Sequence, residues 1–340
     1  MNPQQAVQLL VPELSSIIQL RYRILQTIAV AGPIGRRTIL DTLKISERTV
    51  RNEIALLNDQ NLIETSQKGM ICTSKGYGIL EELKETFQEV SGLGLKEKKL
   101  AKTLGIKKVI IVPGDVNADP GIQQLIGKEA SEYLTSIAKK DYTVAITGGS
   151  TVASLTNFLA PTKALSALTF VAARGSLGNE MSLQANTLVS QFASKCGADF
   201  RTLYLPENLS ETAFTTMVQE PIVKEVLDFY EDIDIVIHGI GSATEMAYRR
   251  DSSETIIKML GEKNAVGEAF GYYFDEIGEI IYRINTVGIQ LEQVKQSPHI
   301  IAVAGGVSKA KAIEAYFKNN AAQQTVLVTD EGAANAILEK

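Results

Sequence analysis

The residues best suited to binding an anion lie in a short glycine loop near the middle of the chain. The segment T-V-A-I-T-G-G-S-T-V-A-S-L (residues 143–155) runs from β-branched residues through Gly148-Gly149 to the hydroxyls of Ser150 and Thr151. Glycines let a backbone turn sharply and approach a ligand, because they carry no Cβ. The hydroxyls and the N–H groups at the start of a following helix favour phosphate. The segment therefore predicts a strand, a phosphate-binding turn and a helix.

Charged side chains follow two further predicted strands. Arg174 offers a planar fork of hydrogen-bond donors, and Lys309 offers a point charge after Gly305-Gly306. The alternative is that these glycine turns only connect strands to helices. Neither the nucleoside-triphosphate motif G-x-x-x-x-G-K-[ST] nor a G-x-G-x-x-G after a first strand is present. Gln184 and Glu268 could hydrogen-bond the hydroxyls of a phosphorylated sugar. The residues predicted to bind such a sugar are Gly148, Gly149, Ser150, Thr151, Arg174, Gly175, Gln184, Glu268 and Lys309.

The titratable residues give little support to catalysis. His238 ends a predicted strand within H-G-I-G, where a catalytic role is conceivable, but capping of a backbone group is the favoured interpretation. Asp115, Asp330 and Glu331 also follow strands and could act as general bases, yet none has a recognisable partner. We therefore predict no catalytic residue.

Composition indicates a two-domain protein of a reducing compartment. The 340 residues are 45% hydrophobic, which is enough for real cores. Cys72 and Cys196 fit neither a disulfide framework nor a zinc site, so we predict no metal and no cofactor. No segment is long and apolar enough to cross a membrane, and no signal peptide is evident, so a cytoplasmic location is expected.

The N-terminal part has the pattern of a helix-turn-helix. Residues 12–30 show helical periodicity, Gly32-Pro33 breaks it, and residues 36–43 and 47–60 form two shorter helices. Ser46 can cap the last of these. Two short helices around a tight turn, the second polar and basic at its start, are typical of DNA-binding domains. The residues predicted to contact DNA are Arg36, Arg37, Ser46, Arg48, Thr49, Arg51 and Lys68.

A predicted hairpin at residues 62–73, with Lys68 at its tip, adds the wing of a winged helix. Residues 1–90 carry ten Lys/Arg and ten Asp/Glu, so the basic residues predicted to contact DNA lie on a domain without net charge. The rest of the chain holds the net charge of −5. The alternative is an ordinary helical domain with solvated arginines. One helix over residues 76–90 is predicted to end this domain. We place the boundary at Ser91-Gly92-Leu93-Gly94, which gives domains 1–90 and 91–340.

Strands and helices alternate in the second domain. Apolar strands with glycines at their carboxyl ends predict an open, parallel, doubly wound (Rossmann-like) sheet whose ligands bind at those ends. Residues 269–282 interrupt the alternation and predict an antiparallel hairpin, as a flap or sheet edge beside the site. The predicted strands are residues 108–113, 143–147, 168–173, 200–205, 233–237, 300–304 and 325–328, and the predicted helices include 121–139 and 181–196.

Several strings resemble SorC/DeoR-type sugar-responsive transcriptional repressors, most closely those that regulate glycolytic genes in Gram-positive bacteria. The strings are G-R-R-T-I-L-D-T-L-K-I-S-E-R-T-V-R, V-A-I-T-G-G-S-T, V-A-A-R-G-S-L-G, H-G-I-G, E-A-F-G-Y-Y-F, I-I-A-V-A-G-G-V-S-K-A-K-A-I-E-A-Y-F and T-V-L-V-T-D-E-G-A-A. The resemblance runs from about residue 12 to the C-terminus.

This resemblance implies a repressor of glycolytic genes that binds operator DNA and has fructose 1,6-bisphosphate as its inducer. It implies a sugar-phosphate domain similar to isomerases and deaminases but without their activity, and a homo-oligomer, dimeric or tetrameric on DNA. Ser150, Thr151, Arg174, Gln184, Glu268 and Lys309 would contact the sugar, and Arg249-Arg250 would serve the response. Two alternatives remain open at this stage: a repressor that answers another phosphosugar, and an active isomerase or deaminase fused to a DNA-binding domain.

Overall fold

The structure is a computed structural model that describes residues 10–176, 180–206, 210–284 and 287–339. The chain divides into two compact units, Met1–Lys96 and Glu97–Lys340. Leu177 and Gly178, which the resemblance to known repressors included, lie outside the described residues.

The first unit is a winged helix, as predicted. A bridge between Ile34 and Met70 ties the chain ahead of α3 to the two-stranded wing, in which Ser66 pairs with Gly69. Its elements are α2 (Pro12–Ala31), α3 (Arg36–Leu43), α4 (Glu47–Asp59), β1 (Ile63–Ser66), β2 (Gly69–Cys72), α5 (Ser74–Glu82) and α6 (Lys84–Ser91), and α7 (Leu93–Leu104) crosses into the second unit.

Helix α4 has the predicted cap and the predicted apolar face. The Ser46 hydroxyl accepts a hydrogen bond from the Thr49 N–H at 3.1 Å, so one of the unpaired N–H groups of the first turn is satisfied. Val50, Ile54 and Leu57 are buried on one side of the helix. The opposite face of α4 is therefore left for solvent or a partner.

The single helix predicted over residues 76–90 is wrong, because the chain forms α5 and α6 with a break at Leu83. Both pieces pack on α2. The Tyr22 ring stacks on Phe87 with centroids 4.1 Å apart, and its hydroxyl donates to the Leu80 carbonyl. The two helices are therefore held against the same Tyr22 side chain, a contact that the local sequence pattern does not reveal.

The second unit is built on a parallel seven-stranded sheet, which confirms the predicted doubly wound fold. The strand order is β3-β13-β12-β7-β4-β5-β6, and every neighbouring pair is parallel. The sheet strands are β3 (Lys108–Val112), β4 (Thr143–Ile146), β5 (Thr169–Ala172), β6 (Asp199–Arg201), β7 (Ile235–Gly239), β12 (His299–Val303) and β13 (Thr325–Asp330). Strands buried on both faces explain the continuous apolar runs of the sequence.

The direction of winding reverses between two neighbouring strands. From β4 the chain adds β5 and β6 on one side, and from β7, beside β4, it adds β12 and β13 on the other. Connections that leave in opposite directions open a crevice at the strand carboxyl ends.

The helices of this unit are α8 (Ile122–Ile137), α9 (Ser150–Ser154), α10 (Ala185–Cys196), α11 (Glu211–Met217), α12 (Pro221–Asp228), α13 (Ala243–Arg249), α14 (Glu254–Glu262), α15 (Leu291–Gln296), α16 (Ala310–Asn319) and α17 (Glu331–Leu338), with short 3-10 turns η1 (Leu155–Phe158), η2 (Leu165–Ala167), η3 (Met181–Leu183), η4 (Phe229–Glu231) and η5 (Val307–Lys309).

Two predicted elements of this unit are shorter than expected. The strand predicted over residues 200–205 ends at Arg201, because Asn186 bonds both the N–H and the carbonyl of Leu203 at 2.8 Å and draws the chain out of the sheet. The helix predicted from Met181 begins with η3, and α10 starts only at Ala185. The Leu183 carbonyl is used instead to accept the Gly149 N–H.

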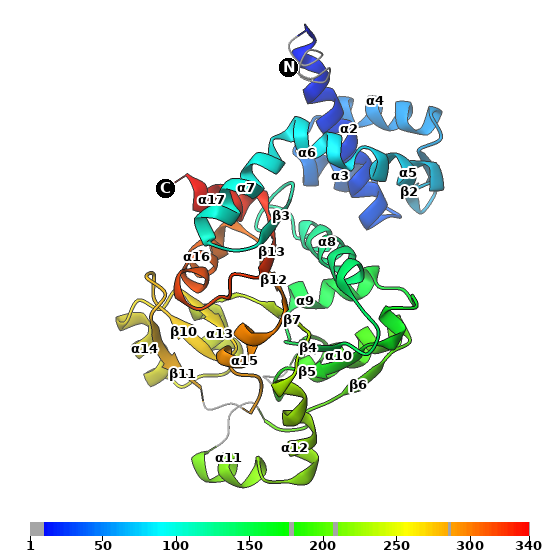
Figure 1. Cartoon of the computed structure of the whole chain (residues 1–340). Helices are drawn as coiled ribbons and strands as arrows, with labels where there is room; N and C mark the ends of the chain where they lie inside the picture. The colour runs from blue at the N-terminus through cyan, green and yellow to red at the C-terminus, as the bar shows by residue number, and fades with distance from the viewer. Residues whose placement is uncertain (1–9, 177–179, 207–209, 285–286, 340) are drawn as a thin grey trace. The chain divides into compact units, whose positions relative to one another are not determined.

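The residues around 269–282 form part of a separate antiparallel sheet rather than an edge of the large one. Its strands are β8 (Gly241–Ser242), β9 (Gly267–Ala269), β10 (Tyr272–Phe274) and β11 (Ile280–Arg283). The predicted strand from Ala269 to Phe274 is interrupted at Phe270-Gly271, where both residues have positive φ, as in a tight hairpin turn. Figure 1 shows this sheet in yellow, with α13 and α14 beside it and apart from the large sheet.

We expect Gly69→Ala to destabilise the winged helix by about 1–3 kcal/mol, because φ is 127° at this position and a β-carbon would lie 2.8 Å from the Ile34 nitrogen. Calorimetric unfolding of the full chain measures this as a lower transition temperature. Gly78→Ala is the matched control, since that glycine lies in α5 with nothing within 4 Å of the new β-carbon. The control should be neutral or slightly stabilising. Equal effects of the two changes would contradict the assigned turn.

Candidate functional site

A pocket of about 520 Å³, including space open to solvent, lies at the carboxyl ends of β4, β5, β7 and β12, where the winding reverses. The structure brings most of the sequence-predicted ligand residues together around it: Gly148, Gly149, Ser150, Thr151, Arg174, Arg249, Glu268 and Lys309. The remaining lining residues are Thr147, Val152, Gly239, Ile240, Gly241, Glu245, Met246 and Val303. Gly175 and Gln184 do not line it. Gln184 is buried as the N-cap of α10, and the Gly175 N–H donates to the Val287 carbonyl.

The glycine loop presents hydroxyl groups in a defined orientation. Gly149 has φ of 120°, a conformation that favours glycine, and the loop leads directly into α9. The Gln123 amide of α8 donates to Ser150 Oγ at 2.9 Å and to Thr151 Oγ1 at 3.0 Å. Each hydroxyl oxygen that accepts from Gln123 keeps its own O–H as a donor. The loop is therefore prepared to donate hydrogen bonds to an anion, and the part played by Gln123 was missed in the sequence.

The Gly305-Gly306 loop is different, because its backbone donors are already used. The N–H groups of Gly306, Val307 and Ser308 donate to Asp330 Oδ2 at 2.7 Å, Asp115 Oδ1 at 3.2 Å and Asn117 Oδ1 at 2.9 Å. What this loop offers to the pocket is the amine of Lys309, which ends η5 and has no hydrogen bond or ion pair with the described residues.

The same contacts correct the suggestion that Asp115 and Asp330 could be general bases. Asp330 is fully buried and also accepts the N–H groups of Val116 at 2.7 Å and Ala333 at 2.9 Å. Burial raises its pKa although these hydrogen bonds lower it. A carboxylate that accepts several backbone N–H groups holds loops in place, and both residues are structural here.

His238 caps a backbone group, as favoured from the sequence. Its Nδ1 lies 3.0 Å from the Gly239 carbonyl, which can only accept, so Nδ1 carries the proton. Nε2 then accepts from the Tyr316 hydroxyl at 3.4 Å. Burial lowers the pKa of His238 to about 4, against smaller opposing effects of the Gly239 hydrogen bond and Glu268. A neutral, enclosed imidazole with both nitrogens bonded supports the pocket wall.

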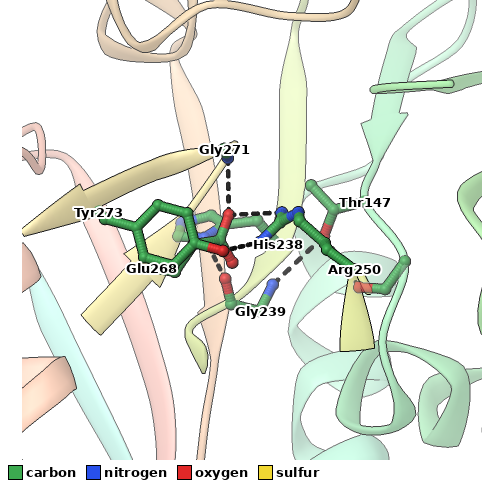
Figure 2. A network of polar contacts seen from close by, with 8 residues as sticks. Thr147, His238, Gly239, Arg250, Glu268, Gly271 and Tyr273 are labelled. Carbon is green, nitrogen blue, oxygen red and sulfur yellow. Dashed lines mark hydrogen bonds and ion pairs between the residues drawn. The ribbon is translucent and has the colours of Figure 1, made fainter. Parts of the chain in front are cut away.

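Glu268 of β9 is the buried carboxylate of the pocket, and Figure 2 shows its polar contacts. Its Oε1 accepts from Arg250 Nη2 at 2.8 Å and from the Gly271 N–H at 2.6 Å. Burial by itself raises the pKa of Glu268, but the charges of Arg250 and Arg174 and these two hydrogen bonds outweigh it and lower the pKa. Glu268 is therefore ionised at neutral pH and acts as a hydrogen-bond acceptor.

Cationic side chains balance this carboxylate around the pocket. Arg174, at the end of β5, is 9% exposed and influences Glu268. Arg249, on α13, lines the same pocket and forms an ion pair with Glu245 at 3.1 Å. The pocket thus combines hydroxyl donors, guanidinium groups and an amine with a single buried carboxylate acceptor, a donor set suited to a phosphorylated polyol.

The residues predicted to contact DNA gather on α3, α4 and the wing. Arg36, Arg37, Ser46, Arg48, Arg51 and Lys68 are exposed, and Thr49 is half-buried. Arg51 forms an exposed pair with Glu47 at 3.0 Å. Exposed pairs of this kind are weak, so Arg51 can exchange Glu47 for a phosphate at little cost.

Within the described ranges, no group of three or more His, Cys, Asp or Glu side chains is arranged to hold a metal ion. No helix in the described part of the chain has the length and apolar character needed to span a membrane.

Comparison with known families matches both units. A family model described as a sugar-binding domain matches residues 88–339, and one described as the CggR N-terminal DNA binding domain matches residues 17–87. The central glycolytic genes regulator of Bacillus subtilis is 42% identical over 334 residues, which cover 98% of both chains. The chain belongs to the SorC family of sugar-binding transcriptional regulators.

Solved structures agree with this assignment. A regulator from Enterococcus faecalis assigned to the SorC family is 40% identical, with a TM-score of 0.67 over 72% of this chain and 99% of its own. The full-length sorbitol operon regulator of Klebsiella pneumoniae, 17% identical, shares the fold with a TM-score of 0.63 over 95% of this chain and 99% of its own. Because its relatives are transcriptional regulators, this chain is one too, and the interpretation as an active isomerase or deaminase is wrong.

The buried His238 predicts a pH dependence of stability. Its pKa is about 4 in the folded chain and 6.5 as a free side chain, so the unfolded chain binds the proton more readily. The contribution of neutral His238 to the free energy of unfolding is fully present above pH 6.5 and is lost as the pH drops toward 4. Between pH 7.5 and pH 5 the free energy of unfolding should fall by about 2 kcal/mol. Urea unfolding at the two pH values measures this loss.

The His238→Phe variant should keep the ring packing and lose most of this pH dependence, whatever its stability at pH 7.5. His299→Gln is the control, because His299 is only partly buried and its removal should leave most of the dependence in place. A His238→Phe variant with the same pH dependence as the parent chain would refute the assignment.

Proposed function

We propose that this protein represses glycolytic genes by binding operator DNA, and that fructose 1,6-bisphosphate binds the pocket as its inducer. The observation that carries the ligand assignment is the set of anion donors from separate strand ends around one cavity: the glycine loop, Arg174 and Lys309. The DNA role rests on family membership and on the basic face of the winged helix. The name of the B. subtilis relative supplies the target genes.

A bisphosphate fits the distribution of donors better than a single phosphate does. The hydroxyls of Ser150 and Thr151 can hold one phosphate, and the Lys309 amine, with Arg249, can hold another. Glu268, which lines the same pocket, then accepts a hydroxyl of the sugar.

The second candidate ligand is a sugar monophosphate, because one phosphate and several hydroxyls would also satisfy part of this donor set. Titration calorimetry of the purified chain without DNA separates the two. The ligands are fructose 1,6-bisphosphate, fructose 6-phosphate, glucose 6-phosphate and glucosamine 6-phosphate. Tight binding of the bisphosphate alone supports the proposal. Preference for a monophosphate would replace the effector and leave the DNA role in place.

Arg174→Ala should preserve operator binding and weaken the response to fructose 1,6-bisphosphate by at least tenfold in the half-effective concentration. The reason is the loss of a buried charged donor, worth about 1.5–3 kcal/mol. Gel-shift titration with and without sugar measures both properties. Lys258→Ala, at an exposed position of α14 outside the pocket, is the matched control. Sugar sensitivity equal to that of the parent chain would remove Arg174 from the site.

Arg48→Ala should weaken operator binding, and the slope of log affinity against log salt concentration should fall in magnitude by about 1 if Arg48 neutralises one phosphate. A loss confined to particular operator sequences would instead assign Arg48 to a base edge. Fluorescence anisotropy with labelled operator at several salt concentrations measures both. Lys258→Ala again serves as the control and should leave the slope unchanged. An unchanged affinity in Arg48→Ala would contradict the assigned DNA face.

The proposed mechanism is linkage between two binding events. A ligand that binds one subunit arrangement more tightly than another shifts the population of arrangements, and the cooperative grip on DNA changes with it. We infer a homo-oligomer, a dimer that forms a tetramer on DNA, acting in the cytoplasm where the operator is found. Sedimentation velocity with and without operator and sugar tests the assembly.

A further inference from the structure

Arg250 is a buried cation that stands behind the pocket wall rather than in it. Its side chain is 4% exposed, and it is not among the lining residues. Nη2 donates to Glu268 Oε1 at 2.8 Å, and Nη1 donates to the Tyr273 hydroxyl at 3.1 Å, with the guanidinium 5.7 Å from the Tyr273 ring centre. Figure 2 shows dashed lines from Arg250 to both of these side chains. Arg250 is thus tied to a pocket residue without reaching a ligand itself.

The two oxygens of Glu268 have different surroundings. Oε1 takes both the Arg250 and the Gly271 donors. Oε2 accepts no hydrogen bond from the described residues, and it lies 3.9 Å from the point where a β-carbon would sit on Gly241, a residue of the pocket wall. The orientation that Arg250 and Gly271 impose on Oε1 therefore directs Oε2 to the pocket.

We propose that Arg250 is a positioning residue that keeps Glu268 an ionised acceptor, so that the pocket selects a hydroxyl of its ligand at Oε2 and rejects an anionic oxygen there. This inference rests on the proposed phosphosugar ligand. It adds which group of the pocket selects a hydroxyl of that ligand. A carboxylate can only accept hydrogen bonds, so a hydroxyl matches it and a phosphate oxygen does not. A buried carboxylate without its arginine would take up a proton and could then donate instead.

The other charged groups around Glu268 do not replace Arg250. Arg174 approaches from β5 and lowers the pKa of Glu268 by its charge, an effect smaller than that of the Arg250 charge. His238 of β7, whose pKa is about 4, is neutral between pH 6 and 8. The Tyr273 hydroxyl faces Arg250. On the pocket side the titratable and charged groups are Glu245, Arg249 and Lys309.

Proton linkage measured by calorimetry tests the proposal. Fructose 1,6-bisphosphate is titrated at pH 7 into the full chain and into Arg250→Met, each in two buffers of different ionisation enthalpy. In the variant, Glu268 is protonated before the sugar binds, and it regains the strong acceptor of the ionised carboxylate only by losing that proton. Binding should weaken by at least about tenfold and release up to about one proton more than in the parent chain. The titration of the sugar phosphates is common to both and cancels.

Two controls separate this from a loss of packing. Arg250→Lys keeps the positive charge and should keep the proton number of the parent chain. 1,6-Hexanediol bisphosphate has two phosphates and no other hydroxyl, so it should show no difference in affinity or proton number between the parent chain and Arg250→Met. Weaker sugar binding in Arg250→Met with an unchanged proton number would overturn the proposal, because a merely structural role gives that result.

A stability measurement tests the same charge relation without any ligand. Arg250→Met removes the main compensating charge of a buried carboxylate, so its unfolding temperature should be well below that of Arg250→Met/Glu268→Gln, in which neither member of the Arg250–Glu268 pair is charged. This comparison also decides the matter if the single variant does not fold. A double variant as unstable as the single one would overturn the proposal. Failure of the parent chain to bind any phosphosugar refutes the proposed function instead, and this comparison remains valid.

Discussion

The reversal of winding between β4 and β7 is the constraint on which the rest of this molecule depends. Parallel strands direct all their carboxyl ends to one edge of the sheet. The connections that follow β4 and β7 leave in opposite directions, so they do not fill the space between these two strand ends. The pocket lies in that space. The glycine loop and Arg174 follow the neighbouring strands β4 and β5, and Lys309 lies more than a hundred residues further along the chain, after β12. They meet because each follows the carboxyl end of a strand of this sheet.

Hydrogen bonding divides the strand-end loops into two kinds. In the Gly148-Gly149 loop, Gln123 orients the hydroxyls toward the cavity. In the Gly305-Gly306 loop, Asp115, Asn117 and Asp330 take the backbone donors, because a buried N–H must find a partner. Similar glycine pairs therefore have different uses: one presents its own polar groups, and the other is held rigid so that Lys309 can present an amine.

Buried charge gives the pocket its chemical character. Glu268 would be costly as an isolated anion, and Arg250 and Arg174 make its ionised form stable within the protein. A cavity lined only by cations and hydroxyls would accept any polyanion of the right size. One fixed acceptor among donors restricts binding to ligands that carry both phosphate and hydroxyl groups. This is the chemistry expected of a regulator that responds to the concentration of a phosphorylated sugar.

The sequence by itself determined the local elements and most of the pocket's inventory. Runs such as residues 144–146 and 300–304 are apolar on both faces, which is sufficient to predict buried parallel strands, and the polar residues that follow them must then meet at one edge. Ser46 identified the start of α4 because capping is a local interaction. Tertiary structure alone decided the break at Leu83, the shortened β6, the separate sheet that carries Glu268, and the roles of Gln123 and Arg250. Each of these depends on a partner distant in sequence, such as Tyr22, Asn186 or Tyr273, and no local pattern encodes such a contact.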